Sequence, residues 1–123
     1  MSEIIFKELS YEIINSALEV YKKLGYGFLE KVYENSLLIV LKKKGIKAEK
    51  QVPIKVYFDG EVVGDYFTDI LVDDKIILEL KTAPKIIDAH RFQTLNYLKA
   101  TGIRLGIVIN FGEDKLEYKR VVL

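Results

Sequence analysis

Residues 69–81 read Asp69-Ile70-Leu71-Val72-Asp73-Asp74-Lys75-Ile76-Ile77-Leu78-Glu79-Leu80-Lys81. Two apolar runs flank the Asp73-Asp74 pair, a pattern typical of two strands joined by a tight turn. Core-like strands rarely carry charge, yet this stretch ends in Glu79-Leu80-Lys81. Because alternate residues of a strand project from the same face, Glu79 and Lys81 should lie side by side. The pattern predicts a hairpin with charged groups at one end.

The segments after this hairpin predict a crossover unit. A helix is expected from Pro84 to Ala100, closed by Gly102. The apolar run 105–109 indicates a buried strand, and residues 115–123 follow a turn at 112–114 as a last strand. Since a helix connects the strand ending at Lys81 to the strand at 105–109, these two strands should be parallel.

The segments before the hairpin predict two helices and two strands. Apolar residues near helical spacing indicate helices over 6–24 and 29–44, each followed by a glycine. Alternation over 52–58 predicts a strand, Asp59-Gly60 a turn, and 61–72 the next strand. The expected order is α-α-β-β-β-α-β-β. This is an α/β chain with a mixed sheet flanked by helices, and residues 1–123 suit one domain.

Composition limits the classes of function. The chain has 123 residues, of which 50% are hydrophobic and 30% charged, and it contains no cysteine. Disulfides and thiolate metal sites are therefore excluded, and we expect a cytoplasmic protein without a signal peptide or a membrane span. The net charge of +1 is not that of a dedicated nucleic-acid binder. Contact with a phosphate backbone would need a local basic patch or a bound cation.

Asp69 and Glu79 are the candidate catalytic carboxylates, with Lys81 beside them. Two carboxylates on neighbouring strands can share one hard cation, and Mg²⁺ or Mn²⁺ prefers such oxygen ligands. A bound cation polarises a phosphoryl oxygen and lowers the pKa of water. The alternative is that Glu79 and Lys81 form an ordinary ion pair on a solvated strand face.

The length of the turn between the two strands decides whether Asp69 and Glu79 can bind the same cation. A two-residue turn at Asp73-Asp74 would place Asp69 opposite Leu78, and the two carboxylates would then lie on opposite faces. A shared cation requires them on one face. We therefore predict a three-residue connection or a bulge between the strands.

Two further segments carry polar groups at informative spacing. His90, Gln93 and Tyr97 fall on one stripe of the expected helix, which suggests a site wall. The alternative is a half-exposed face on which Tyr97 belongs to the core. Glu30 and Tyr33 follow a glycine-rich turn at the start of the second helix, where an acid is also favoured by the helix dipole.

These motifs, in this order, resemble the PD-(D/E)XK nuclease superfamily. Asp69 and Glu79-Leu80-Lys81 match its central motif, although Thr68 stands where the superfamily often has proline. Gln93-x-x-x-Tyr97 resembles the QxxxY motif of the RecB-type exonuclease branch. Gly27-x-x-Glu30-x-x-Tyr33 resembles the signature of the GxxExxY protein family. The resemblance implies a restriction-endonuclease-like fold with an αβββαβ core.

The resemblance also implies an activity, a cofactor and a role for each residue. Glu30, Asp69, Glu79 and the Leu80 carbonyl would hold Mg²⁺ (or Mn²⁺), and Lys81 would position water or stabilise charge. The implied substrate-binding residues are Gln93, Tyr97, His90 and Tyr33. The expected function is hydrolysis of DNA or RNA phosphodiesters, with nucleic acid as partner and a homodimer as a possible arrangement. Two alternatives remain open: a catalytically silent interaction module with the nuclease fold, or a hydrolase of a small phosphate compound.

Overall fold

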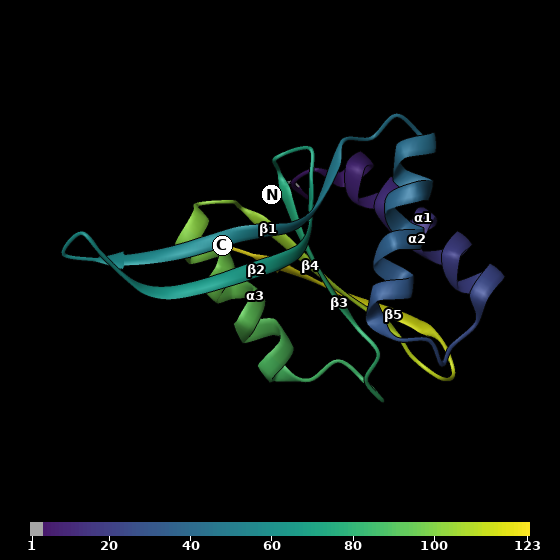
Figure 1. Cartoon of the computed structure of the whole chain (residues 1–123). Coiled ribbons are helices and arrows are strands. Elements are labelled where there is room, and N and C mark those ends of the chain that lie inside the picture. Colours follow the sequence, from purple (N-terminus) through teal and green to yellow (C-terminus); the bar gives the residue numbers. More distant parts are fainter. Residues whose placement is uncertain (1–3) are drawn as a thin grey trace.

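The computed structural model describes residues 4–123 (Figure 1). Its elements, in chain order, are α1 (Lys7–Leu24), α2 (Glu30–Lys43), β1 (Ala48–Phe58), β2 (Glu61–Val72), β3 (Ile76–Lys81), α3 (Asp88–Thr101), β4 (Leu105–Phe111) and β5 (Leu116–Val122). This is the predicted order, and most boundaries fall within two residues of those expected. The first strand is longer than expected, because it begins at Ala48 and not at Val52.

The five strands form one mixed sheet in the order β1-β2-β3-β4-β5. β3 and β4 are parallel and are joined by α3, so the predicted crossover unit is confirmed. All other neighbours in the sheet are antiparallel. Helices α1 and α2 cover one face and α3 the other (Figure 1). The predicted α/β class, a mixed sheet flanked by helices, is confirmed.

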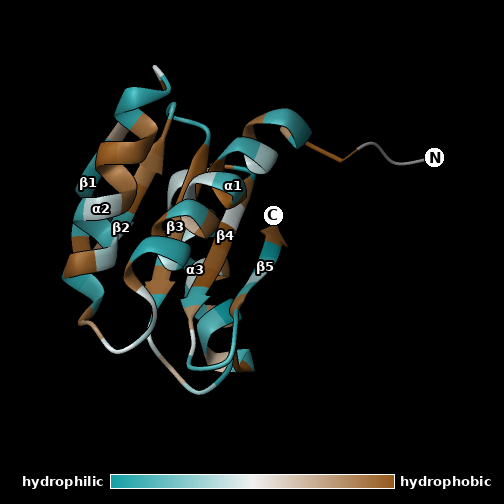
Figure 2. Ribbon diagram, turned by 90° about the vertical axis from the view of Figure 1, so that its right-hand side faces the viewer, coloured by the Kyte–Doolittle hydropathy of each residue, from teal (hydrophilic) through white to brown (hydrophobic). Residues whose placement is uncertain are grey.

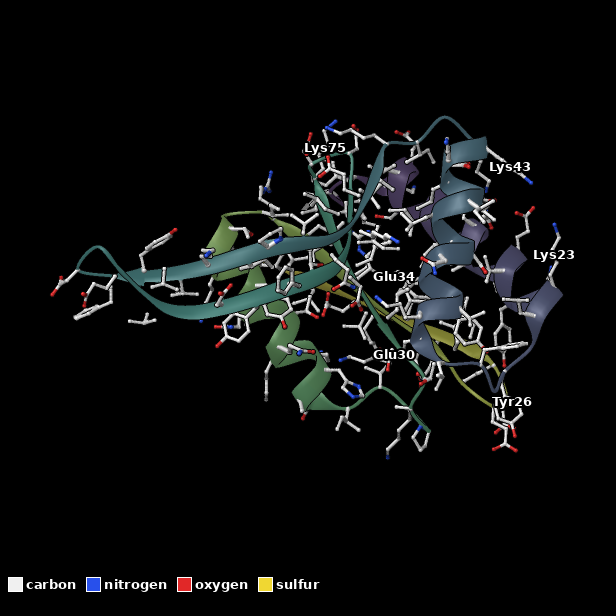
Figure 3. The ribbon with its side chains drawn as sticks, viewed as in Figure 1. Lys23, Tyr26, Glu30, Glu34, Lys43 and Lys75 are labelled. Atoms are coloured by element: carbon white, nitrogen blue, oxygen red, sulfur yellow. The ribbon has the colours of Figure 1, made fainter. Side chains whose placement is uncertain are left out.

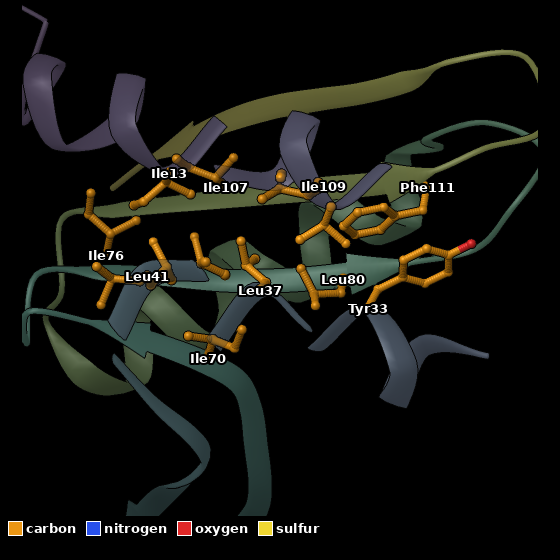
Figure 4. Close-up of a cluster of buried hydrophobic side chains, with 14 of the residues drawn as sticks. Ile13, Tyr33, Leu37, Leu41, Ile70, Ile76, Leu80, Ile107, Ile109 and Phe111 are labelled. Atoms are coloured by element: carbon orange, nitrogen blue, oxygen red, sulfur yellow. The ribbon is translucent and has the colours of Figure 1, made fainter. Parts of the chain in front are cut away.

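The larger part of the core lies between the sheet and the pair α1 and α2 (Figure 4). Every residue of β4 is buried, as in strands covered on both faces, and Figure 2 shows β3 and β4 as mostly hydrophobic. Side chains from both helices and the central strands meet here, among them Ile13, Leu37, Leu41, Ile70, Leu80 and Ile109. Within residues 4–123, no helix is both long and apolar enough to span a bilayer.

Helix α3 lies close to the opposite face of the sheet. A Cβ atom on Gly106 would collide with the Thr94 side chain, so glycine at this position permits the close approach of α3 to β4. The expected start of this helix at Pro84 is wrong, because α3 begins at Asp88. The preceding backbone is held elsewhere: the Ile86 N–H donates to Glu117 Oε1 at 2.9 Å, and Ile87 is extended.

Strands β1 and β2 continue past the rest of the sheet as a two-stranded hairpin arm (Figure 1). The arm, residues 52–68, turns at Asp59-Gly60, where both residues have positive φ. Its pairing shifts by one residue between Val56 and Tyr57. The β2–β3 pairing, in contrast, ends at Ile70 opposite Leu78. The two strands therefore separate at the point where Asp69 and Glu79 lie.

Candidate active site

The turn between β2 and β3 places Asp69 and Glu79 on one face. Val72 pairs with Ile76, which leaves a three-residue connection, Asp73 to Lys75. Asp73 and Asp74 both adopt left-handed backbone, with φ of 51° and 57°. The predicted three-residue connection is confirmed, and continuing this register sets Asp69 opposite Glu79.

Asp69 and Glu79 exchange hydrogen bonds with the opposite strand. The Asp69 N–H donates to Glu79 Oε2 at 3.0 Å, and the Leu80 N–H donates to Asp69 Oδ2 at 2.7 Å. The Thr68 hydroxyl also donates to Glu79 Oε2, at 2.9 Å. These bonds end on one oxygen of each carboxylate, so the second oxygen of each is not used by them.

Burial, and repulsion from a neighbouring carboxylate, raise the pKa of both carboxyl groups. Glu79 is only 3% exposed, and its pKa rises to about 7 because burial disfavours the charged form and Asp69 adds repulsion. The pKa of Asp69 is also raised, chiefly by burial and then by repulsion from Glu34, against the Leu80 N–H and Lys81. Burial, more than repulsion between charges, therefore disfavours the ionised form of these two carboxyl groups.

Helix α2 supplies two more carboxylates. Figure 3 shows Glu30 and Glu34 on the side of α2 that faces the sheet and α3. They line a pocket of about 180 Å³ together with Lys31, Gln51, Asp69 and Leu80. Burial and the charge of Asp69 raise the pKa of Glu30, and Lys81 opposes this rise. The structure thus brings Glu30 to the Asp69 side of the candidate site, as the resemblance implies.

Helix α3 completes the other wall. Lys81 Nζ donates to Gln93 Oε1 at 2.9 Å, and Gln93 Nε2 donates to the Tyr97 hydroxyl at 3.1 Å. Gln93 therefore points to Lys81, although its side chain remains exposed. None of the ion pairs among residues 4–123 includes Lys81, so the alternative of a simple Glu79–Lys81 ion pair is not supported.

Tyr97 is both a core residue and a part of the polar stripe formed with His90 and Gln93. Its ring is 5% exposed and belongs to the core cluster under α3, while its hydroxyl reaches Gln93. Burial and the charge of Glu79 raise its pKa. His90 lies at the start of the same helix, where its Nδ1 accepts the Ile87 N–H at 3.2 Å. Burial and the nearby Lys81 lower the pKa of His90, so the imidazole is held neutral beside the site.

Tyr33 is the one candidate that the structure does not bring to the site. Its side chain is fully buried and stacks on Phe111, with ring centroids 4.2 Å apart. Its hydroxyl donates to the Gly25 carbonyl at 2.7 Å and accepts the Phe28 N–H at 3.3 Å. The expected substrate contact is thus corrected: Tyr33 closes the loop before α2, and α2 carries Glu30.

Three site residues escaped the sequence analysis: Glu34, Gln51 and Thr68. Glu34 is one turn after Glu30, a spacing that could have identified it, because both then share a helix face. Gln51 meets Glu34 across 17 positions of sequence and has no local signal. Thr68 occupies a position at which the superfamily often has proline, and its hydroxyl donates to Glu79.

The donor chemistry suits a hard divalent cation, although the side chains are not gathered around one point. Within residues 4–123, no three His, Asp or Glu side chains are placed to hold a metal ion together. Asp69 and Glu79 are turned toward backbone N–H groups, and Glu30 lies across the pocket. Carboxylate oxygens and the Leu80 carbonyl are nevertheless ligands that Mg²⁺ accepts, and a cation would relieve the repulsion that raises these pKa values. The residues fit the ion by chemistry and charge.

The largest pocket of the described chain lies elsewhere. It has a volume of about 650 Å³ and lies between α1 and β5, lined by Tyr11, Ile14, Leu18, Tyr118 and others. Its lining is mainly apolar and includes none of the carboxylates described above. The candidate site is therefore distinguished by its carboxylates and not by the size of its pocket.

Comparison with solved structures shows the fold. The crystal structure of SSO0001 superposes with a TM-score of 0.62 at 20% identity over 95% of this chain, which spans only 59% of that protein. The alkaline exonuclease LHK-Exo from Laribacter hongkongensis has a TM-score of 0.56 at 11% identity, over 99% of this chain and 72% of that protein. A search of curated protein sequences found no match.

A family model for the PD-(D/E)XK nuclease superfamily matches residues 7–121, which include every candidate residue described above. Nucleases of this superfamily generally use divalent metal ions. The match, the mixed sheet and the converging carboxylates lead to one conclusion: this chain belongs to the PD-(D/E)XK nuclease superfamily.

Proposed function

We propose that this chain is a Mg²⁺- or Mn²⁺-dependent nuclease that hydrolyses DNA or RNA phosphodiesters at the Asp69–Glu79 site. The observation that carries the proposal is the convergence of buried Glu79 and half-buried Asp69, with Lys81 nearby, at the point where β2 and β3 separate. The family match and the likeness to LHK-Exo support it. The Gln93–Tyr97 pair further supports placement in the RecB-type QxxxY branch, and the Gly27, Glu30 and Tyr33 spacing in the GxxExxY family.

Each residue has a defined part in this proposal. Glu30, Asp69, Glu79 and the Leu80 carbonyl oxygen hold the cation, which supplies Lewis-acid activation of the phosphoryl oxygen and of water. Lys81 places its ammonium beside the phosphoryl oxygens and stabilises the charge that develops on them. Gln93 both donates and accepts, so it fixes the Lys81 ammonium and contacts the substrate side. His90 and Tyr97 border the same wall.

The direct test is cleavage of end-labelled single-stranded DNA, duplex DNA and RNA by the purified chain. Cleavage in Mg²⁺ or Mn²⁺ that stops in EDTA supports the proposal, and the labelled products distinguish endonuclease from exonuclease action. Hydrolysis of a small phosphodiester without cleavage of any polymer would favour the small-phosphate alternative. Binding of Mn²⁺ without hydrolysis of any of these compounds would indicate the catalytically silent module.

We also propose a homodimer, formed through the hairpin arm. The arm exposes large apolar side chains, with Tyr57 62%, Phe58 68% and Val63 63% exposed. Strand alternation places Phe58, Val63 and Phe67 on one face of the arm, opposite Tyr57 and Val62. The first group presents roughly 400 Å² of apolar surface, within the range of about 300–600 Å² for the largest patch of a monomer, which is often functional.

The charge of the arm favours a protein partner over nucleic acid. Lys55 is the single cation between residues 52 and 68, against the acids Asp59, Glu61 and Asp65. An acidic, apolar surface repels a phosphate backbone, whereas apolar side chains of a protein partner can pack against it.

Light scattering across a concentration series tests the homodimer. The wild type should have the mass of a dimer, and Phe58→Ser with Val63→Ser should give a folded monomer. Tyr11→Ser, which removes an equally exposed ring from α1, is the matched control and should remain dimeric. A monomeric wild type at every concentration would reject the dimer and leave the proposed nuclease site unaffected.

A further inference from the structure

Gln51 has an unfavourable backbone conformation in the middle of a strand. Its φ is 51°, in the left-handed region that residues with a side chain rarely adopt. The pairs on either side, Lys50 with Ile70 and Val52 with Thr68, belong to the β1–β2 ladder, but no Gln51–Asp69 pair joins them. Residues held in this way persist only where surrounding structure enforces them, and they gather at functional sites.

The side chain of Gln51 accounts for this conformation. Its Nε2 donates to Glu34 Oε1 at 2.6 Å, and Glu34 is only 3% exposed. The pairs on either side set Gln51 opposite Asp69, and both residues line the same pocket. The Gln51 amide lowers the pKa of the Asp69 carboxyl group, opposing the rise caused by burial and by Glu34. Gln51 therefore provides donor hydrogens between two carboxylates that repel each other.

We propose that Gln51 is a positioning residue, whose amide holds Asp69 in place across the pocket from Glu34. In this arrangement Asp69 keeps its Oδ2 on the Leu80 N–H. The strained backbone delivers the amide to the pocket at a cost in stability. The expected effect of Gln51 on cation binding rests on the proposed function. The role of Gln51 in orienting Asp69 does not depend on that function.

The informative substitution is Gln51→Gly, because it separates this role from a structural one. Glycine adopts positive φ without steric cost, which relieves the strain, whereas loss of the amide removes the donor to buried Glu34. The two effects oppose each other, so the unfolding temperature should stay near that of the wild type. A residue that served only to shape the strand would leave Asp69 unaffected by this change.

The matched control is Asp59→Gly. Asp59 has nearly the same φ, 50°, but lies at the tip of the hairpin arm, away from the pocket. It reproduces the change of a left-handed residue to glycine without touching Glu34 or Asp69. Asp69→Asn provides the reference for loss of the carboxylate itself.

Two measurements report on the orientation of the Asp69 carboxylate. In metal-free protein, hydrogen exchange of the Leu80 amide should accelerate in Gln51→Gly, because its acceptor is no longer held, while the amides of β4 keep their protection. In calorimetric titrations with Mn²⁺, affinity should fall about 10- to 100-fold, as when other residues that support metal ligands are changed. Asp59→Gly should match the wild type in both measurements.

The outcomes are distinguishable. Unchanged exchange at Leu80 in Gln51→Gly overturns the positioning role, whatever happens to Mn²⁺. Faster exchange there, with stability kept, supports it. If the wild type fails to bind Mn²⁺, the proposed metal-dependent function is lost, while the exchange at Leu80 still decides the role of Gln51.

Discussion

Asp69 and Glu79 each accept a backbone N–H from the other's strand, Glu79 from Asp69 itself and Asp69 from Leu80. The β2–β3 ladder ends at Ile70 and Leu78. Beyond this pair, the two carboxylates accept hydrogen bonds from N–H groups that backbone carbonyl groups would otherwise bind. The strands can separate here without leaving these N–H groups unpaired. The same bonds orient both carboxylates before any cation binds.

Neutralising either carboxylate should abolish cleavage without weakening the fold. Asp69→Asn and Glu79→Gln keep an oxygen that accepts the N–H and remove a carboxylate whose charged form is disfavoured, chiefly by burial and then by neighbouring carboxylates. Cleavage should fall by more than about 100-fold, since even outer-shell changes cost 10- to 100-fold. Thermal unfolding should show equal or higher stability. Asp65→Asn, on the exposed arm, is the control, and wild-type cleavage by both site variants would refute the catalytic role.

Metal-free stability should decrease as pH rises from about 4.5 to 7. Folding raises the pKa of Glu79 from 4.5 to about 7, so within this interval the native state binds more protons than the unfolded chain. Stability is then greatest below the unfolded pKa and is lost as pH rises through the folded pKa, by up to about 3 kcal/mol. Urea unfolding in EDTA at pH 5 and pH 8 measures this change.

Glu79→Gln is the control for this pH dependence. Glutamine does not titrate, so the variant should lose most of the decrease between pH 5 and pH 8 and exceed the wild type at pH 8. Asp69, whose pKa is raised in the same direction, should account for a smaller remainder at lower pH. An unchanged slope in Glu79→Gln would show that Glu79 is not the group responsible.

Tyr33→Phe should weaken the fold and the site together. The ring still packs on Phe111, but the Gly25 carbonyl and the Phe28 N–H lose the hydroxyl that joins them. Unfolding free energy should fall by about 1 kcal/mol, and cleavage should decline because the start of α2 carries Glu30. Tyr11→Phe, an exposed tyrosine on α1, should change neither. A higher KM with unchanged stability would instead indicate that Tyr33 contacts the substrate, as first expected from the sequence.

Gln93→Ala should impair cleavage through Lys81. The substitution removes the acceptor of the Lys81 ammonium and the donor to Tyr97 from an exposed position on α3. Cleavage should fall about tenfold with stability within ~0.5 kcal/mol, as is usual for surface changes. Asn96→Ala, exposed on the same helix, is the matched control. Equal cleavage by both variants would make the Gln93–Tyr97 pair irrelevant to the chemistry.

Local patterns in the chain were sufficient for the architecture. Alternating apolar residues identified the strands, the crossover rule set β3 parallel to β4, and the requirement for a shared face predicted the three-residue turn. These features follow from neighbours in sequence, where steric preference and periodic burial act. The same reasoning identified Asp69, Glu79 and Lys81, because charges at the end of a buried strand contradict the local pattern.

Tertiary structure alone decided which side chains meet across the site. Gln51 reaches Glu34 and Lys81 reaches Gln93 because helices pack on the sheet at one register. Thr68 reaches Glu79 because β2 lies beside β3. Packing also buries Tyr33 in the core. Helix α3 begins only at Asp88, because Glu117 of β5 binds the backbone of the preceding loop. A residue's own neighbours encode which face is buried. Its partner across the fold depends on how every other element is packed.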